Sequence, residues 1–174
     1  MAVATWIAYL GVHFMLVPGW FAWRYRRSPY ALRWPPRNGY DLGESAYGLL
    51  VASYPMAVLI GPLIEPRSTV PAVACVIAGS AMIVWTVATL GRSWRIGQDE
   101  GDTTCVYVAR GPYRILRHPI YLGMIISALG QMLLTAADMR GLILLVGTVA
   151  YALFQGREES RRWANRIDDE RICP

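Results

Sequence analysis

The sequence predicts an all-α integral membrane bundle of about five transmembrane helices, and three observations lead to this fold class. The first is composition: the 174-residue chain has a mean hydropathy of +0.31 and only 17% charged residues, against about 25% in soluble domains. The second is a set of five stretches without Asp, Glu, Lys or Arg, at 2–23, 45–64, 68–91, 119–137 and 141–156. A bilayer core requires about 20 apolar residues per helix. A soluble globular enzyme, a disordered chain and a disulfide-stapled secreted module are therefore excluded.

The third observation is the distribution of the basic residues, all 17 of which are arginines. Fifteen lie in the loops after the first, third and fifth stretches, and two lie in the opposite loops. Because cytosolic loops of membrane proteins are enriched in Arg and Lys, we expect the N-terminus outside and the C-terminus in the cytosol. The absence of Lys favours a GC-rich genome, so a bacterial cell membrane is expected. The net charge of +5 is then a signal of topology, and no nucleic-acid partner is expected.

The first stretch and the loop after it contain three features that bear on their local structure. Pro18-Gly19 predicts a kink or an early exit of the first helix. His13 lies in mid-span, and we interpret it as a neutral side chain bonded to a neighbouring helix, the alternative being a functional ionisable group. The loop 28–44 carries aromatic residues typical of the interface and two consecutive prolines, so it is expected to be partly irregular.

The third stretch follows a short turn expected at residues 65–67. Small residues gather in its outer half: Ala72, Ala74, Ala78, Gly79, Ser80 and Ala81. Such residues allow close helix approach in a membrane, which is typical of a scaffold helix.

The last two stretches form an expected helical hairpin with a tight turn near 138–140. The 16 residues of 141–156 extend only about 24 Å as a helix. We expect this helix to continue through Gly156 into the cytosol, because the residues that follow are good helix formers. Glu158 and Glu159 would then lie at the membrane face among arginines.

The loop between the third and fourth stretches contains the most chemistry. Residues 106–108 suggest a short extended piece, and residues 111–123 read GPYRILRHPIYLG. Pro119 is favoured in the first turn of a helix, so His118 is expected at or next to the N-cap. A helix N-terminus attracts carboxylates and phosphates.

Four side-chain positions in this segment suit a ligand. Arg114 and Arg117 offer planar forks for a carboxylate, and His118 can form hydrogen bonds in either protonation state. Gly123 lacks a side chain, so a ligand is able to lie against the helix there. The alternative is a basic membrane anchor followed by an ordinary proline-started helix. We expect Arg117 to hold a carboxylate and Arg114 to be an interfacial anchor.

The segment 111–123 resembles the GPYRxxRHPxYxG signature of the isoprenylcysteine carboxyl methyltransferase family, which shares its membrane core with phospholipid N-methyltransferases. The Gly91-Arg-Ser-Trp94 string and the pair Glu158-Glu159 also match, and the resemblance covers residues 85–163. It implies S-adenosylmethionine in a cytosolic cofactor pocket. Cofactor contacts are implied for Tyr113, His118, Tyr121, Gly123 and Glu159. Catalytic roles are expected for Arg117, Glu158 and Glu159.

The implied activity is carboxyl O-methylation of a lipophilic acceptor that enters from the bilayer, among membrane lipids. The alternatives are a phospholipid N-methyltransferase-like enzyme, an NADPH-dependent membrane reductase and a non-enzymatic membrane scaffold. No metal is expected, since Cys75, Cys105 and Cys173 lack metal-ligand spacing.

The chain is too short for a separate soluble domain beside five spans. We expect a single membrane domain over 1–174. Residues 1–91 are assigned to scaffold spans one to three, and 92–174 to the cofactor-binding loop, the helical hairpin and the cytosolic tail.

Overall fold

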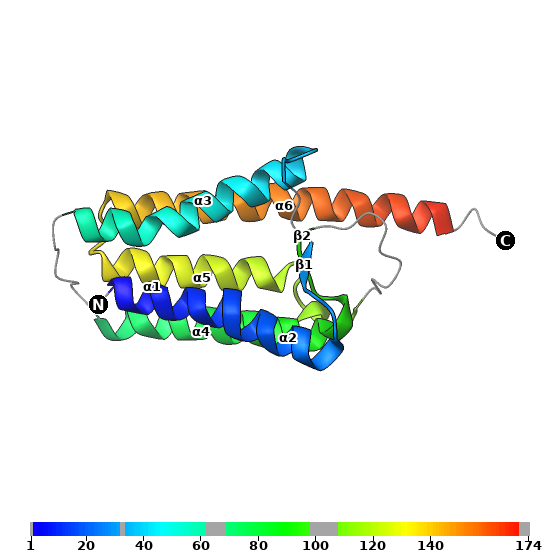
Figure 1. Cartoon of the computed structure of the whole chain (residues 1–174), viewed down its shortest axis with the longest axis horizontal. Helices are drawn as coiled ribbons and strands as arrows, with labels where there is room; N and C mark the ends of the chain where they lie inside the picture. Colours follow the sequence, from blue (N-terminus) through cyan, green and yellow to red (C-terminus); the bar gives the residue numbers. More distant parts are fainter. Residues whose placement is uncertain (1, 32–33, 62–68, 98–107, 171–174) are drawn as a thin grey trace.

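The described residues form five helical rods that run roughly along the long axis of the molecule (Figure 1). A computed structural model describes residues 2–31, 34–61, 69–97 and 108–170, with side chains to residue 161. The first rod joins α1 (Ala2–Leu10), a π-helical segment η1 (Gly11–Leu16) and α2 (Val17–Tyr25). The others are α3 (Gly39–Ile60), α4 (Thr69–Leu90), α5 (Pro119–Leu134) and α6 (Met139–Glu170). Shorter elements are β1 (Tyr30–Ala31), η2 (Gly91–Ser93), β2 (Ile96–Gly97) and η3 (Gly111–Arg114).

Three of the described helices are long and apolar enough to cross a membrane: Ala2–Tyr25, Thr69–Ser93 and Met139–Arg161. The fourth predicted span, α5, is a shorter apolar helix of 16 residues. The second, α3, has 22 residues, but its first turns carry Asp41 and Glu44. The prediction of an all-α membrane bundle is confirmed, while three of the five predicted spans meet the length and composition of a crossing helix.

Helices α4 and α5 pack against each other through residues without side chains. A Cβ on Gly123 would lie 2.8 Å from the Gly79 carbonyl oxygen, and one on Gly130 would lie 2.6 Å from the Ala72 carbonyl oxygen. These distances are too short for any residue larger than glycine. The prediction that small residues of the third stretch allow close helix approach is confirmed.

The first rod passes through Pro18 and continues to Tyr25, so of the two predicted alternatives, a kink or an early exit, the early exit does not occur. Pro18 has no N–H to offer the Phe14 carbonyl four residues earlier, and the Tyr30 hydroxyl donates a hydrogen bond to that carbonyl instead. The π-helical segment lies directly before this position. His13, on that segment, is buried, and its ring nitrogens have no hydrogen-bond partner among the described residues. It packs beside Tyr9, with ring centroids 4.5 Å apart, instead of forming the expected bond to a neighbouring helix.

The α5–α6 hairpin brings the end of the apolar part of α6 back to the start of α5. Asp138 directly precedes α6, and its Oδ1 accepts a hydrogen bond of 3.0 Å from the Gly141 N–H, as N-cap residues do. The helix then runs 32 residues, past Gly156. The predicted continuation of the last helix is confirmed. The predicted tight turn is present at residues 135–138, slightly earlier than the expected 138–140.

A short parallel ladder ties the first loop to the segment after α4, with Tyr30 opposite Ile96 and Ala31 opposite Gly97. The sequence did not predict this pairing in the loop 28–44. The turn expected at 65–67, most of the extended piece expected at 106–108, and two of the cysteines lie outside the described residues.

Candidate active site

A cluster of polar side chains forms where the starts of α3 and α5 meet α6. We call it the Glu159 cluster, and its members are Tyr40, His118, Tyr121, Glu159 and Ser160. The starts of α3 and α5 present Tyr40, His118 and Tyr121, and α6 presents Glu159 and Ser160. His118 is the N-cap residue of α5, because Pro119 opens that helix as predicted. Tyr40 lies in the first turn of α3. The N-cap of that helix is Asn38, whose side chain accepts a 2.9 Å hydrogen bond from the Asp41 N–H.

The carboxylate of Glu159 is the centre of this cluster. Its Oε1 accepts hydrogen bonds from the Tyr121 hydroxyl at 2.6 Å and the Tyr40 hydroxyl at 3.4 Å. Its Oε2 lies 3.2 Å from Nδ1 of His118. A carboxylate has about four acceptor positions, so these contacts orient Glu159 and still leave capacity for a further donor. The side chains of His118 and Glu159 are each 28% exposed, so the carboxylate is accessible.

The second ring nitrogen of His118 also faces a side chain of α6. Its Nε2 lies 3.1 Å from Oγ of Ser160, and the Ser160 hydroxyl lies 2.8 Å from the Gly156 carbonyl oxygen. A Cβ on Gly156 would lie 3.4 Å from Cδ2 of His118. That distance is an ordinary van der Waals contact, so the ring packs against α6 without requiring a glycine at position 156.

A second carboxylate lies behind the cluster, on α3. Oε1 of Glu44 accepts hydrogen bonds from the Tyr151 hydroxyl at 2.9 Å and from Nε2 of Gln155 at 3.3 Å. Gln155 Nε2 also donates to the Tyr40 carbonyl oxygen at 3.1 Å. Gln155 is fully buried, and its amide oxygen has no hydrogen-bond partner among the described residues. This network fixes α3 against α6 and leaves one buried acceptor unpaired.

The sequence profile of the isoprenylcysteine carboxyl methyltransferase (ICMT) family matches residues 72–162, just over half of the chain. The protein belongs to this family. No curated protein and no solved structure gives a significant match. The resemblance drawn from the signature is thus confirmed, and family membership implies methyltransferase activity in a membrane protein.

Three residues predicted from the ICMT family signature and the glutamate pair come together in the structure: His118, Tyr121 and Glu159. Burial, and after it the negative charge of Glu159, raises the pKa of the Tyr113 hydroxyl on η3. Glu158 is directed elsewhere and forms an ion pair of 2.9 Å with Arg161.

The remaining predicted residues lie outside the cluster. Arg114 and Arg117 are both exposed, Arg114 at the end of η3 and Arg117 directly before the α5 N-cap. Gly123 is on the face of α5 that contacts α4. Its missing side chain serves helix packing, so we leave Gly123 out of the proposed cofactor contacts.

Tyr40, Glu44 and Ser160 were missed by the sequence reasoning. Tyr40 and Glu44 precede the second apolar stretch, and their spacing of four residues places them on one face of a helix. The sequence therefore offered one signal for them, a tyrosine and a glutamate on the same helix face at the membrane boundary. Both lie outside residues 72–162 of the ICMT family match.

Proposed function

We propose that this ICMT family member is an S-adenosylmethionine-dependent methyltransferase that methylates the carboxylate of a lipophilic, prenylcysteine-like acceptor. The observation that carries the proposal is the Glu159 cluster, in which His118 and Tyr121 of the family signature orient a carboxylate from the next helix. This carboxylate is partly exposed and lies at the N-terminal end of α5.

The chemistry of the cluster suits this cofactor. S-adenosylmethionine offers two ribose hydroxyls and a methionyl ammonium as hydrogen-bond donors. Glu159 has spare acceptor capacity, and the amide oxygen of Gln155 is a buried acceptor without a partner among the described residues. We propose that Glu159 accepts from a ribose hydroxyl or the ammonium, and that His118, Tyr121 and Tyr113 line the same site.

When bound, the cofactor supplies an electrophilic methyl group. A carboxylate acceptor is already a nucleophile, so the protein needs no general base and contributes position and a site shielded from water. We propose that Arg117 holds the carboxylate of the acceptor or of the cofactor, supported by the positive end of the α5 dipole. Arg114 is proposed as an interfacial anchor. Glu158 is proposed to position the α6 surface through Arg161.

We also propose a topology with the N-terminus outside and the C-terminus in the cytosol of a bacterial cell. The arginine asymmetry of 15 against 2 supports it. The Glu159 cluster would then face the cytosol, where the water-soluble cofactor is made, while the acceptor reaches it from the bilayer. A cysteine introduced at Asp138 is expected to react with membrane-impermeant reagents added from outside.

Transfer of a radioactive methyl group to N-acetylated farnesylcysteine tests the proposed function. We expect label in the extracted ester only when the acceptor has a free carboxylate. Label in phosphatidylethanolamine instead would indicate a phospholipid N-methyltransferase-like enzyme. Calorimetric binding of NADPH without binding of S-adenosylhomocysteine would indicate a reductase, and binding of neither would indicate a scaffold.

A further inference from the structure

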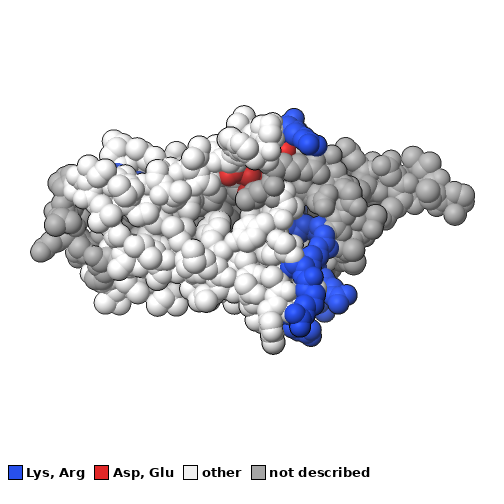
Figure 2. Space-filling model, viewed as in Figure 1, with Lys and Arg blue, Asp and Glu red and all other residues white. Residues whose placement is uncertain are grey.

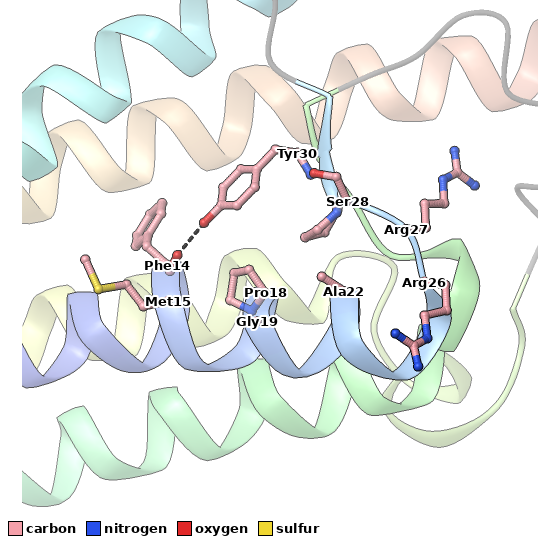
Figure 3. Close-up of a pocket in the computed structure, with 10 residues that line it drawn as sticks. Phe14, Met15, Pro18, Gly19, Ala22, Arg26, Arg27, Ser28 and Tyr30 are labelled. Carbon is pink, nitrogen blue, oxygen red and sulfur yellow. Dashed lines mark hydrogen bonds between the residues drawn. The ribbon is translucent and has the colours of Figure 1, made fainter.

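An open groove of about 510 Å³ runs along the first rod (Figure 3), and no residue of the Glu159 cluster lines it. Its floor is apolar and comes from η1 and α2: Phe14, Met15, Pro18, Gly19 and Ala22. All of its lining residues lie between positions 14 and 30, outside the part of the chain that matches the ICMT family. The groove is therefore a feature of this chain beside the family's methyltransferase core.

Two details keep the groove open. A Cβ on Gly19 would have no atom within 4 Å, so the missing side chain leaves space in the middle of the floor. On the opposite wall, the hydroxyl of Tyr30 reaches across to the Phe14 carbonyl (Figure 3). This hydrogen bond holds Tyr30, in the loop after α2, against η1, so that the loop forms the second wall of the groove.

One end of the groove is basic. Arg26, Arg27 and Ser28 line it where α2 ends, and all three residues are exposed. Arg26 terminates the helix in the left-handed conformation, with φ of 55°. Figure 2 shows arginines gathered along this end of the molecule, while the surface beside it is largely uncharged.

The dimensions of the groove match a lipid chain. Positions 14 to 26 span about 18 Å at 1.5 Å per residue, slightly more than half of a hydrocarbon core of about 30 Å. The rod that carries them, Ala2–Tyr25, has the length and composition of a membrane-crossing helix. The apolar floor then lies at the depth of one leaflet, and the two arginines lie at the level of the headgroups.

We propose that the groove is a binding site for an anionic phospholipid, with an acyl chain on the apolar floor and the headgroup at the basic end, attracted by the charges of Arg26 and Arg27, whose side chains point to different sides of the end of α2 (Figure 3). Charge complementarity selects the anionic headgroup, because juxtamembrane arginines attract anionic lipids. The site is separate from the Glu159 cluster, since none of its lining residues belongs to that cluster.

Native mass spectrometry of the detergent-purified protein, titrated with dioleoylphosphatidylglycerol or dioleoylphosphatidylcholine, tests this proposal. We expect tighter retention of the anionic lipid by at least fivefold. Arg26→Gln should reduce its affinity about fivefold, since one interfacial arginine contributes about 1 kcal/mol. Inorganic phosphate at the same concentration should not displace the lipid, because the apolar floor is needed for binding.

Gly19→Leu fills the groove without changing its charge and should weaken binding of the anionic lipid at least fivefold. Leucine is a better helix former than glycine, and no atom lies where its Cβ would be. Gly48→Leu on α3 is the matched control, because its Cβ also meets nothing within 4 Å and it lies outside the groove; we expect binding like the parent's.

Equal retention of the two lipids by the parent protein would overturn the proposal, as would displacement of the anionic lipid by inorganic phosphate. Unchanged lipid binding in Gly19→Leu together with a raised KM for the methyl acceptor would assign the groove to the acceptor instead. If Gly19→Leu does not fold, Arg26→Gln decides: an unchanged preference between the two lipids overturns the site.

Discussion

The two sides of α5 differ in how they use their residues. The side facing α4 is built from glycines, and it brings two backbones into contact at Gly79–Gly123 and Ala72–Gly130. The side facing α6 begins with His118 and Tyr121, whose polar groups bind a glutamate that remains 28% exposed. The rigid contact positions the helix, and the accessible end carries the chemistry. This division of roles suits a site that depends on position more than on strong acid–base groups.

The largest effect is expected from disturbing the packed side. A methyl group on Gly79 would meet the Gly123 carbonyl and lie 2.7 Å from the backbone nitrogen of Ser127, and backbone atoms cannot move aside as side chains do. Gly79→Ala should destabilise the fold by about 1–3 kcal/mol or more, measured by thermal unfolding in detergent. Gly48→Ala, with open space around its Cβ, should be neutral or slightly stabilising. Equal stability of the two variants would show that the packed side does not position α5.

The second effect concerns the two arginines before α5. Comparing their lysine variants distinguishes an arginine that binds a carboxylate from one that anchors the chain at the membrane interface. Arg117→Lys keeps the charge but loses the planar fork, and the expected loss of kcat/KM is about 5–150-fold, equivalent to about 1–3 kcal/mol. Arg114→Lys should be nearly silent, because an anchor to lipid phosphates requires only charge. Steady-state methylation kinetics measure both. A larger defect at position 114 would reverse the two roles.

A smaller effect separates the two tyrosines that donate to Glu159. Tyr121→Phe removes a 2.6 Å hydrogen bond to a carboxylate, so we expect about a tenfold loss of kcat/KM. Tyr40→Phe removes a 3.4 Å contact and should cost about twofold. Methylation kinetics on the two variants make the comparison. Equal losses would mean that Glu159 is positioned as much by α3 as by the signature segment of α5.

The features that the sequence predicted well depend on neighbours in the chain. Pro119 opens α5 because proline favours the first turn of a helix, and α6 continues past Gly156 because the following residues are good helix formers. The signature and the glutamate pair identified three of the residues that the structure brings together, His118, Tyr121 and Glu159.

The features that could not be predicted from the sequence depend on contacts between segments far apart in the chain. Tyr40 and Gln155 are 115 positions apart and still share a hydrogen bond, so nothing local to either residue indicates the other. The β1–β2 ladder joins Tyr30 to Ile96 across the whole of α3 and α4. Glu158 and Glu159 are equivalent in sequence, and only the rotation of α6 against α5 distinguishes them.

The difference between Glu158 and Glu159 provides the most direct test of the proposal that the Glu159 cluster binds the cofactor. Calorimetry with S-adenosylhomocysteine should be performed on the parent, Glu159→Gln and Glu158→Gln, each in detergent. We expect Glu159→Gln to weaken binding about 10–150-fold, because it removes a charged hydrogen-bond acceptor worth about 1.5–3 kcal/mol. Glu158→Gln breaks only a peripheral ion pair with Arg161 and should remain within about threefold of the parent. Affinities within twofold of the parent for Glu159→Gln, or a larger loss for Glu158→Gln, would contradict the account.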